Sequence, residues 1–203
     1  MAAELDSSCP EYWECRFLEG RTPWDAGGPP RELVRFLDLK AAGGRVLVPG
    51  CGAAHEALAF HQAGFQVTAI DFSEAACEVA RATLGELASL IQLGDFFTQE
   101  LELSSFDLVY ERAFLCSLPR THWARYVSRV SELLKPSGLL IGLFFFDAAP
   151  EGPPYGLTGD VENELMGQRF ALEVDEIVDG SAAVFAGKER WQEWRLCERD
   201  GGA

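Results

Sequence analysis

The chain has 203 residues, of which 48% are hydrophobic and 24% charged, and its formal net charge is −15 at pH 7. This length and hydrophobic content suffice for one domain with a buried core and do not require a second one. The acidic balance argues against nucleic acid or an anionic membrane as a partner, because both bind a basic face. It is compatible with a cationic ligand, although acidity alone also keeps a protein soluble.

Neither a targeting segment nor a membrane span is expected. Residues 1–14 are acidic and lack the apolar stretch of a signal peptide. The most apolar run, Leu139–Phe146, is far shorter than the roughly 20 residues of a membrane helix and is typical of a buried strand. These features favour a cytoplasmic protein.

The six cysteines are scattered along the chain. They form no C-x-x-C pair, and none has a nearby histidine at zinc-finger spacing, so we expect no metal site. Without a secretion signal, they are expected to be reduced thiols. They are Cys9, Cys15, Cys51, Cys77, Cys116 and Cys197.

The beginning of the chain differs in pattern from the rest. Residues 1–9 are expected to be disordered, and residues 10–203 to form a single domain. Gly20–Pro30 is predicted to be an ordered loop, because Trp24 sits in its middle. Arg31–Leu39 is predicted to be a short helix that ends before Gly43 and Gly44.

Short apolar strands then alternate with helices. Ser73 is predicted to be the N-cap of one helix, and Pro136 to stop another. This alternation indicates a parallel sheet covered on both faces. The predicted strands are 45–48, 66–70, 90–93, 106–110 and 139–146, and the predicted helices are 55–62, 73–84 and 121–134.

The pattern changes after Pro154. A helix is predicted around 160–166, and the segments 169–177 and 183–196 alternate in polarity as an antiparallel pair at the sheet edge would. The expected fold is therefore α/β, a Rossmann-like, doubly wound, mostly parallel sheet with an antiparallel C-terminal edge.

A glycine-containing turn follows the first strand. Gly50 and Gly52 allow a sharp bend and bring backbone amides close to a ligand. Asp71 ends the next strand, where a carboxylate can accept hydrogen bonds from the ribose hydroxyls of an adenosine cofactor. The alternative is a tight strand–helix turn without a ligand.

If the turn binds a cofactor, a dinucleotide and S-adenosylmethionine are the two expected candidates. The dinucleotide fingerprint requires a glycine where this chain has His55, and a cofactor without a pyrophosphate relaxes that demand. After the third strand, Asp95 is placed to accept from the adenine amine and Phe96 to line the ring. Asp95 could instead cap Thr98.

Several motifs together resemble the thiopurine S-methyltransferase family, particularly its thiol and halide methyltransferase branch. The resemblance extends from Tyr12 to about Leu196. The motifs are Tyr12-Trp13, Gly20-Arg21-Thr22-Pro23-Trp24-Asp25, Val48-Pro49-Gly50-Cys51-Gly52, Asp95-Phe96-Phe97, Phe106-Asp107, Arg112-Ala113-Phe114-Leu115-Cys116, Leu133-Leu134-Lys135-Pro136 and Gly152-Pro153-Pro154-Tyr155.

The resemblance implies an N-terminal segment that folds over S-adenosylmethionine. Trp13 and Trp24 match its aromatic positions, and an indole face beside a sulfonium contributes about 0.5–2 kcal/mol. Phe17 stands where family members often have a second tryptophan. Gly50 would contact the methionine portion and Asp71 the ribose.

Two further differences from the family lie in the glycine turn, where Ala54 and Glu56 replace a frequent glycine and aspartate. Arg112 matches a position between cofactor and substrate, so we expect it to contact the cofactor and to act in catalysis. The alternative for Arg112 is a surface salt bridge, for example with Glu111.

Methyl transfer from a sulfonium is an in-line displacement, so catalysis depends on placing the reactants about 3–3.5 Å apart. Only a thiolate attacks, and Arg112 is the candidate cation that lowers the pKa of the thiol. The substrate cavity is expected to be lined by Trp24, Phe114, Phe146 and Tyr155.

The three histidines and two central cysteines are expected to be structural. His55, His61 and His122 lie on predicted helices or their starts, as surface or packing residues rather than bases. Cys51 and Cys116 are interpreted as packing residues, with a redox role left open.

The leading functional hypothesis is a monomeric S-adenosylmethionine-dependent methyltransferase that acts on a small-molecule thiol. A close variant methylates halide, selenium or tellurium species. The sequence also allows a nicotinamide-dependent oxidoreductase on the same sheet or a non-catalytic cofactor-binding protein.

Overall fold

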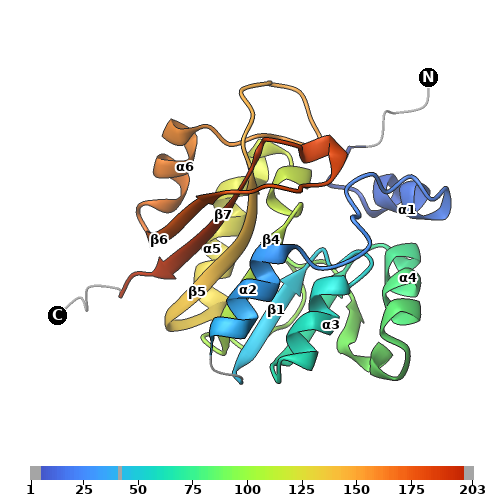
Figure 1. Ribbon diagram of the computed structural model, residues 1–203. Coiled ribbons are helices and arrows are strands. Elements are labelled where there is room, and N and C mark those ends of the chain that lie inside the picture. Colours follow the sequence, from blue (N-terminus) through green and yellow to red (C-terminus); the bar gives the residue numbers. More distant parts are fainter. Residues whose placement is uncertain (1–5, 41–42, 199–203) are drawn as a thin grey trace.

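A computed structural model describes residues 6–40 and 43–198 of the protein. Within these residues, seven strands form one sheet in the order β3-β2-β1-β4-β5-β7-β6 (Figure 1). The strands are β1 (Arg45–Pro49), β2 (Gln66–Asp71), β3 (Ile91–Leu93), β4 (Phe106–Arg112), β5 (Leu134–Phe145), β6 (Phe170–Ile177) and β7 (Glu189–Leu196).

The sheet is parallel from β3 to β5, and among the described strands β7 alone runs opposite to the others. β1 pairs in parallel with β2 and β4, and β5 in parallel with β4. β7 pairs antiparallel with both β5 and β6. The predicted Rossmann-like sheet with an antiparallel C-terminal edge is confirmed.

Helices cover both faces of the sheet. Side chains of α2, α3 and α4 belong to one hydrophobic cluster and those of α5 and α6 to another. Figure 1 shows α2 and α3 in front of the sheet and α5 behind it. The helices are α1 (Pro10–Leu18), α2 (Arg31–Leu39), α3 (His55–Gln62), α4 (Glu74–Leu84), α5 (Trp123–Leu133) and α6 (Gly159–Met166), with short 3-10 helices η1 (Gly85–Leu90), η2 (Leu115–Ser117), η3 (Arg120–His122) and η4 (Ala183–Phe185).

Local sequence signals set several element boundaries. The Ser73 hydroxyl accepts a hydrogen bond from the Ala76 amide at 3.1 Å, as expected of an N-cap. The predicted segment 183–196 is divided, because the buried Phe185 lies in η4 and Gly187 has a φ of +73° before β7 begins. A left-handed residue interrupts an extended segment, so β7 is shorter than predicted.

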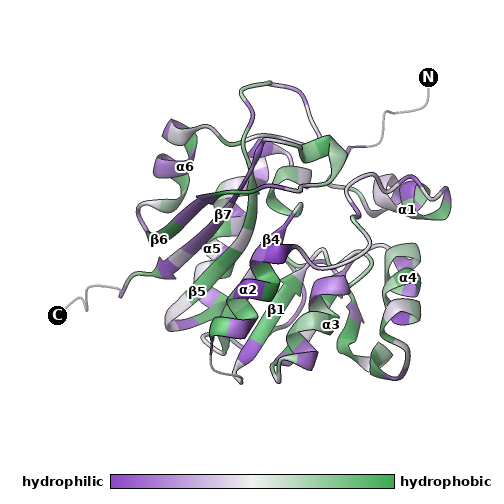
Figure 2. Cartoon of the chain, in the orientation of Figure 1, coloured by the Kyte–Doolittle hydropathy of each residue, from purple (hydrophilic) through white to green (hydrophobic). Residues whose placement is uncertain are grey.

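Charge protects the exposed strand at the end of the sheet. Figure 2 shows hydrophobic β1 and β5 and more hydrophilic β6 and β7. Arg195 on β7 pairs with Glu173 on β6, and Arg190 pairs with Asp175 at 2.6 Å. Charged side chains along an edge strand discourage pairing with another chain.

The N-terminal residues that are described pack against the rest of the protein. The expected disorder of residues 1–9 falls in part on residues 1–5, which lie outside the described residues. Ser7 is buried, and its carbonyl accepts a hydrogen bond from the Trp13 indole at 2.7 Å. None of the described helices has the length and apolar character needed to cross a membrane.

Candidate functional site

Two adjoining cavities lie at the carboxyl ends of the parallel strands. The larger cavity encloses about 1430 Å³ and the smaller about 810 Å³, their open mouths included. The residues that line both are Gly50, Asp71, Phe72, Phe114 and Leu118. Ligands bind at this edge in open α/β sheets, so the two cavities form one candidate site.

The glycine turn between β1 and α3 forms part of the wall. Gly50 and Gly52 have φ values of +58° and +49°, in the left-handed region that glycine adopts without strain. The Cys51 amide donates to the Ile70 carbonyl at 3.0 Å, which ties the turn to β2. At Gly50 and Gly52, which have no side chains, the turn presents its backbone to the cavity.

Asp71 holds this turn and faces both cavities. Its carboxylate accepts hydrogen bonds from the amides of Gly52 and Ser73, each at 3.0 Å. Burial raises the pKa of Asp71, and these amides oppose the rise. A carboxylate has about four lone-pair positions, so Asp71 can still accept from ligand hydroxyls.

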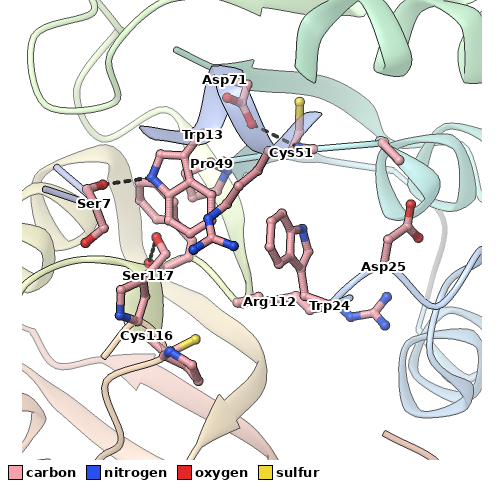
Figure 3. A pocket seen from close by; sticks show the side chains of 18 of the residues that line it. Ser7, Trp13, Trp24, Asp25, Pro49, Cys51, Asp71, Arg112, Cys116 and Ser117 are labelled. Carbon is pink, nitrogen blue, oxygen red and sulfur yellow. Dashed lines mark hydrogen bonds between the residues drawn. The ribbon is translucent and has the colours of Figure 1, made fainter. Parts of the chain in front are cut away.

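An N-terminal covering segment, Pro10–Pro30, lies over the larger cavity. Trp13 and Trp24 meet edge to face with ring centroids 5.3 Å apart, and Phe17 packs on Trp24 at 6.0 Å. All three rings line the cavity. Figure 3 shows Trp13 and Trp24 near Arg112 within it.

The covering segment is fixed by polar contacts, because α1 contains no buried residue. Glu14 accepts hydrogen bonds from the Ser73 hydroxyl at 2.7 Å and the Ala75 amide at 3.0 Å. The amide of Ala75 and the hydroxyl of Ser73 lower the pKa of Glu14. Glu14 thus joins α1 to the first turn of α4.

Arg112 ends β4 and lines the larger cavity. Its guanidinium donates to the Gly28 carbonyl at 3.1 Å and to Glu56. Burial lowers the pKa of Arg112, but the charge and hydrogen bond of Glu56 together with the nearby Tyr110 and Glu189 outweigh burial, and the net direction is upward. The salt bridge is largely buried, with the two side chains 14% and 10% exposed, and it involves Glu56 rather than Glu111.

Glu111 has a separate role that the sequence pattern did not reveal. Its carboxylate accepts from the amides of Phe114 and Leu115 at 3.0 Å and from the Tyr126 hydroxyl at 2.8 Å. Burial raises its pKa to about 7. The turn that it holds includes Ala113 in the left-handed region, with a φ of +57°. The sequence signal for this role was an acidic residue directly after the predicted strand 106–110, at the carboxyl edge of the sheet.

Asp95 both caps a turn and lines the smaller cavity. It accepts from the Phe97 amide at 2.9 Å and the Thr98 hydroxyl at 3.2 Å. Phe96 is buried, lines the same cavity and contacts Phe114 with ring centroids 5.5 Å apart. The capping interpretation is confirmed, and the adenine contact stays a prediction.

The residues expected to line the substrate cavity are divided. Trp24 and Phe114 line it, whereas the described lining of the two cavities includes neither Phe146 nor Tyr155. The Tyr155 amide instead donates to the Cys116 carbonyl at 2.7 Å. The loop of residues 152–155 reaches the cavity through its two prolines, 153 and 154. Contact of Phe146 and Tyr155 with a substrate stays a prediction.

Two lining residues were not expected from the sequence to meet a ligand. His55 lies 3.2 Å from Asp25, and both line the larger cavity. Tyr110 lines the same cavity and is 1% exposed. Its hydroxyl has no hydrogen-bond partner among the described residues.

The buried thiols are poorly suited to chemistry. All six cysteines are free. Burial raises the pKa of Cys51 and Cys116, which disfavours the thiolate needed for nucleophilic or redox reactions. Within 6–40 and 43–198, no cluster of three acidic, histidine or cysteine side chains could hold a metal ion.

Solved structures with the same fold include magnesium protoporphyrin IX methyltransferase from Synechocystis PCC 6803 with bound SAM. Its TM-score is 0.71 at 17% identity, with 97% of this chain and 100% of that chain covered. The 1,6-didemethyltoxoflavin-N1-methyltransferase of Burkholderia thailandensis has a TM-score of 0.73 at 17% identity, covering 93% of this chain and 87% of that one.

The sheet, the glycine turn and the acid at the end of β2 define a Rossmann-like S-adenosylmethionine-dependent methyltransferase. The family model described as thiopurine S-methyltransferase matches residues 9–196, and the chain belongs to this family. This confirms the resemblance found in the sequence.

Similar curated proteins carry three related names. The probable thiol methyltransferase 2 of Arabidopsis thaliana is 33% identical, covering 90% of this chain and 84% of that protein. Thiocyanate methyltransferase 1 of Brassica oleracea is 32% identical, with the same coverage. Thiopurine S-methyltransferase of Pseudomonas fluorescens (strain SBW25) is 30% identical, covering 84% of this chain and 87% of that protein.

Proposed function

We propose that the protein transfers the methyl group of S-adenosylmethionine to a small, soft nucleophile, and that a thiol is its principal acceptor. The observation that carries this proposal is the lining beyond Phe114, where Cys116, Pro153 and Phe185 offer an apolar surface. Polarisable sulfur suits such a surface. The relatives named for thiol, thiocyanate and thiopurine methylation support the same class of acceptor.

The adenosine part of the cofactor fits the shared region and the smaller cavity. Asp71 would accept from the ribose hydroxyls, while Asp95 and Phe96 would receive the adenine. Gly50 would contact the methionine portion through its backbone. The aromatic side chains of the covering segment would surround the sulfonium, since a cation is attracted to ring faces.

The bound cofactor supplies the electrophilic methyl group. The protein's part is to orient the acceptor opposite the leaving sulfur and to exclude water. Orientation removes much of the entropic barrier, and exclusion of water strips the hydration shell from a thiolate. The covering segment and the proline loop close two sides of the cavity for this purpose.

Because Arg112 is paired, it would lower the pKa of a bound thiol less than an unpaired cation would. Glu56 already pairs with it and offsets its charge. Its proposed catalytic role is therefore electrostatic and modest, and the acidity of the acceptor supplies the rest. A guanidinium does not act as a base at neutral pH.

The test is a methyl-transfer assay with labelled S-adenosylmethionine against hydrosulfide, aromatic thiols, a thiopurine, thiocyanate, iodide and selenite. Transfer to thiols should be lost in Asp71→Asn, because an amide nitrogen cannot accept the bonds that Asp71 accepts. Asp175→Asn, an exposed change on β6, is the matched control. S-adenosylhomocysteine binding without transfer to any thiol would contradict the acceptor class.

We also propose that the protein is a cytoplasmic monomer with no nucleic-acid partner. The net charge of −15 disfavours polyanions. Sedimentation with and without a nucleic acid would test the monomeric state and the absence of a nucleic-acid partner.

A further inference from the structure

The larger cavity differs in polarity from one side to the other. Figure 3 places Asp25 and Cys116 on opposite sides of Trp24. On the Asp25 side, Arg112 bonds Glu56 and the carbonyl of Gly28. We call Asp25, Glu56, Tyr110 and Arg112, together with the start of α3 at His55, the polar end.

The polar end contains a hydroxyl that lacks a partner. Tyr110 is 1% exposed and lines the cavity, yet no described residue bonds its hydroxyl. Its ring is fixed by Phe60, with centroids 5.4 Å apart at 71°. Buried hydroxyls are almost always paired, so this one points to a partner that the ligand supplies.

The phenol remains a donor near neutral pH. Burial raises the pKa of Tyr110, and the charge of Glu56 raises it further, whereas Arg112 opposes the rise. A protonated phenol donates most strongly to an anion. An anionic ligand atom is therefore the favoured partner.

The charges of the polar end match a zwitterion. Arg112 and the amino end of the eight-residue helix α3 both favour a carboxylate. Glu56 and Asp25 favour an ammonium group. S-adenosylmethionine has one such zwitterionic part, its amino-acid end, and the adenosine part is already assigned to the Asp71 side.

We propose that the Tyr110 hydroxyl, beside Arg112, donates a hydrogen bond to the carboxylate of the cofactor's amino-acid end. This inference rests on the proposed cofactor orientation. It makes Tyr110 a cofactor-binding residue and assigns Arg112 first to the cofactor rather than to the thiol. The opposite, apolar side is then left for the acceptor.

The experiment is calorimetry on the full chain with two ligands. S-adenosylhomocysteine has the amino-acid end, and 5′-deoxy-5′-methylthioadenosine lacks it. Tyr110→Phe should weaken S-adenosylhomocysteine binding about tenfold or more, since a hydrogen bond to a charged group is lost. Binding of methylthioadenosine should not change, and the melting temperature of the free protein should stay equal or rise.

Tyr126→Phe is the matched control. Its hydroxyl bonds Glu111 at 2.8 Å, so its loss should lower the melting temperature. The ratio of the two dissociation constants should stay that of the wild type.

Two results would overturn the proposal. One is an unchanged ratio of dissociation constants in Tyr110→Phe. The other concerns the wild-type protein alone. If it binds methylthioadenosine as tightly as S-adenosylhomocysteine, the amino-acid end contributes nothing to the affinity. Wild-type protein that binds neither ligand would contradict the cofactor assignment itself.

Discussion

The ring of Phe114 lies against Gly50 so closely that no side chain fits between them. A Cβ built on Gly50 would stand 2.3 Å from Cδ2 of Phe114. The Glu111 carboxylate holds Phe114 there by accepting a hydrogen bond from the Phe114 backbone amide. The glycine turn and the turn after β4 are thus fitted to each other, and both line the two cavities.

Gly50→Ala should therefore destabilise the protein and reduce cofactor binding. A left-handed backbone costs alanine roughly 1–2 kcal/mol, and the clash with Phe114 adds to this. Gly20→Ala is the matched control, because Gly20 also has a positive φ, +63°, and nothing lies within 4 Å of its Cβ position. Urea denaturation should show a larger loss for Gly50→Ala; equal losses would contradict the steric argument.

Glu111→Gln should change how stability depends on pH. The folded pKa of Glu111 is about 7 against a usual value of 4.5, so the folded state holds the extra proton. Its contribution to stability therefore falls as pH rises from 4.5 to 7, by a total on the order of 3 kcal/mol. Glutamine cannot titrate, so the free energy of unfolding of the variant, relative to that of the wild type, should increase between pH 5 and pH 8.

Denaturation curves of both proteins at these two pH values measure this gain. Glu111→Ala is the comparison, because it removes the acceptor of the Phe114 and Leu115 amides and should destabilise at either pH. A difference between wild type and Glu111→Gln that is the same at pH 5 and pH 8 would show that Glu111 does not titrate in this range.

Local patterns were sufficient to predict most of the fold. Apolar runs, the Ser73 cap and the glycine turn involve neighbouring residues, and α2 and α3 have the predicted bounds. The placement of Asp71 followed from the rule that parallel strands end at a common edge. What brought Trp13 and Trp24 into the site was the family resemblance, since their spacing alone also fits core packing.

Contacts between distant segments could not be predicted in this way. Glu56 is 56 positions from Arg112, and their pairing depends on how α3 docks beside β4. The orphaned hydroxyl of Tyr110 is likewise a property of its packed surroundings. A strand pattern marks Tyr110 as buried but says nothing about whether its hydroxyl finds a partner.

Glu14→Gln should loosen the covering segment without unfolding the core. Glutamine retains one acceptor oxygen, but it loses the charge that strengthens the bonds from Ser73 and Ala75. Limited proteolysis of the free protein should cut near α1 faster, while the melting temperature changes little. Glu11→Gln, an exposed change in the first turn of the same helix, should match wild type; equal cleavage of both variants would contradict the role of Glu14.

The pH dependence of methyl transfer should follow the acceptor rather than the protein. Glu56 offsets the charge of Arg112, so an alkyl thiol should keep much of its ordinary pKa, and only its thiolate reacts. The kcat/KM for an aromatic thiol should therefore level off at lower pH than that for an alkyl thiol. Transfer to iodide, which does not titrate, should lack this rise.

The two thiols must be compared under the same conditions to separate the acceptor from the protein. A common midpoint for both would indicate a titrating protein group, and Glu111, whose pKa burial raises to about 7, would be the first to replace, as Glu111→Gln. Separate midpoints that persist in Glu111→Gln would show that this protein selects acceptors by their own acidity, because it orients the thiolate but does not generate it.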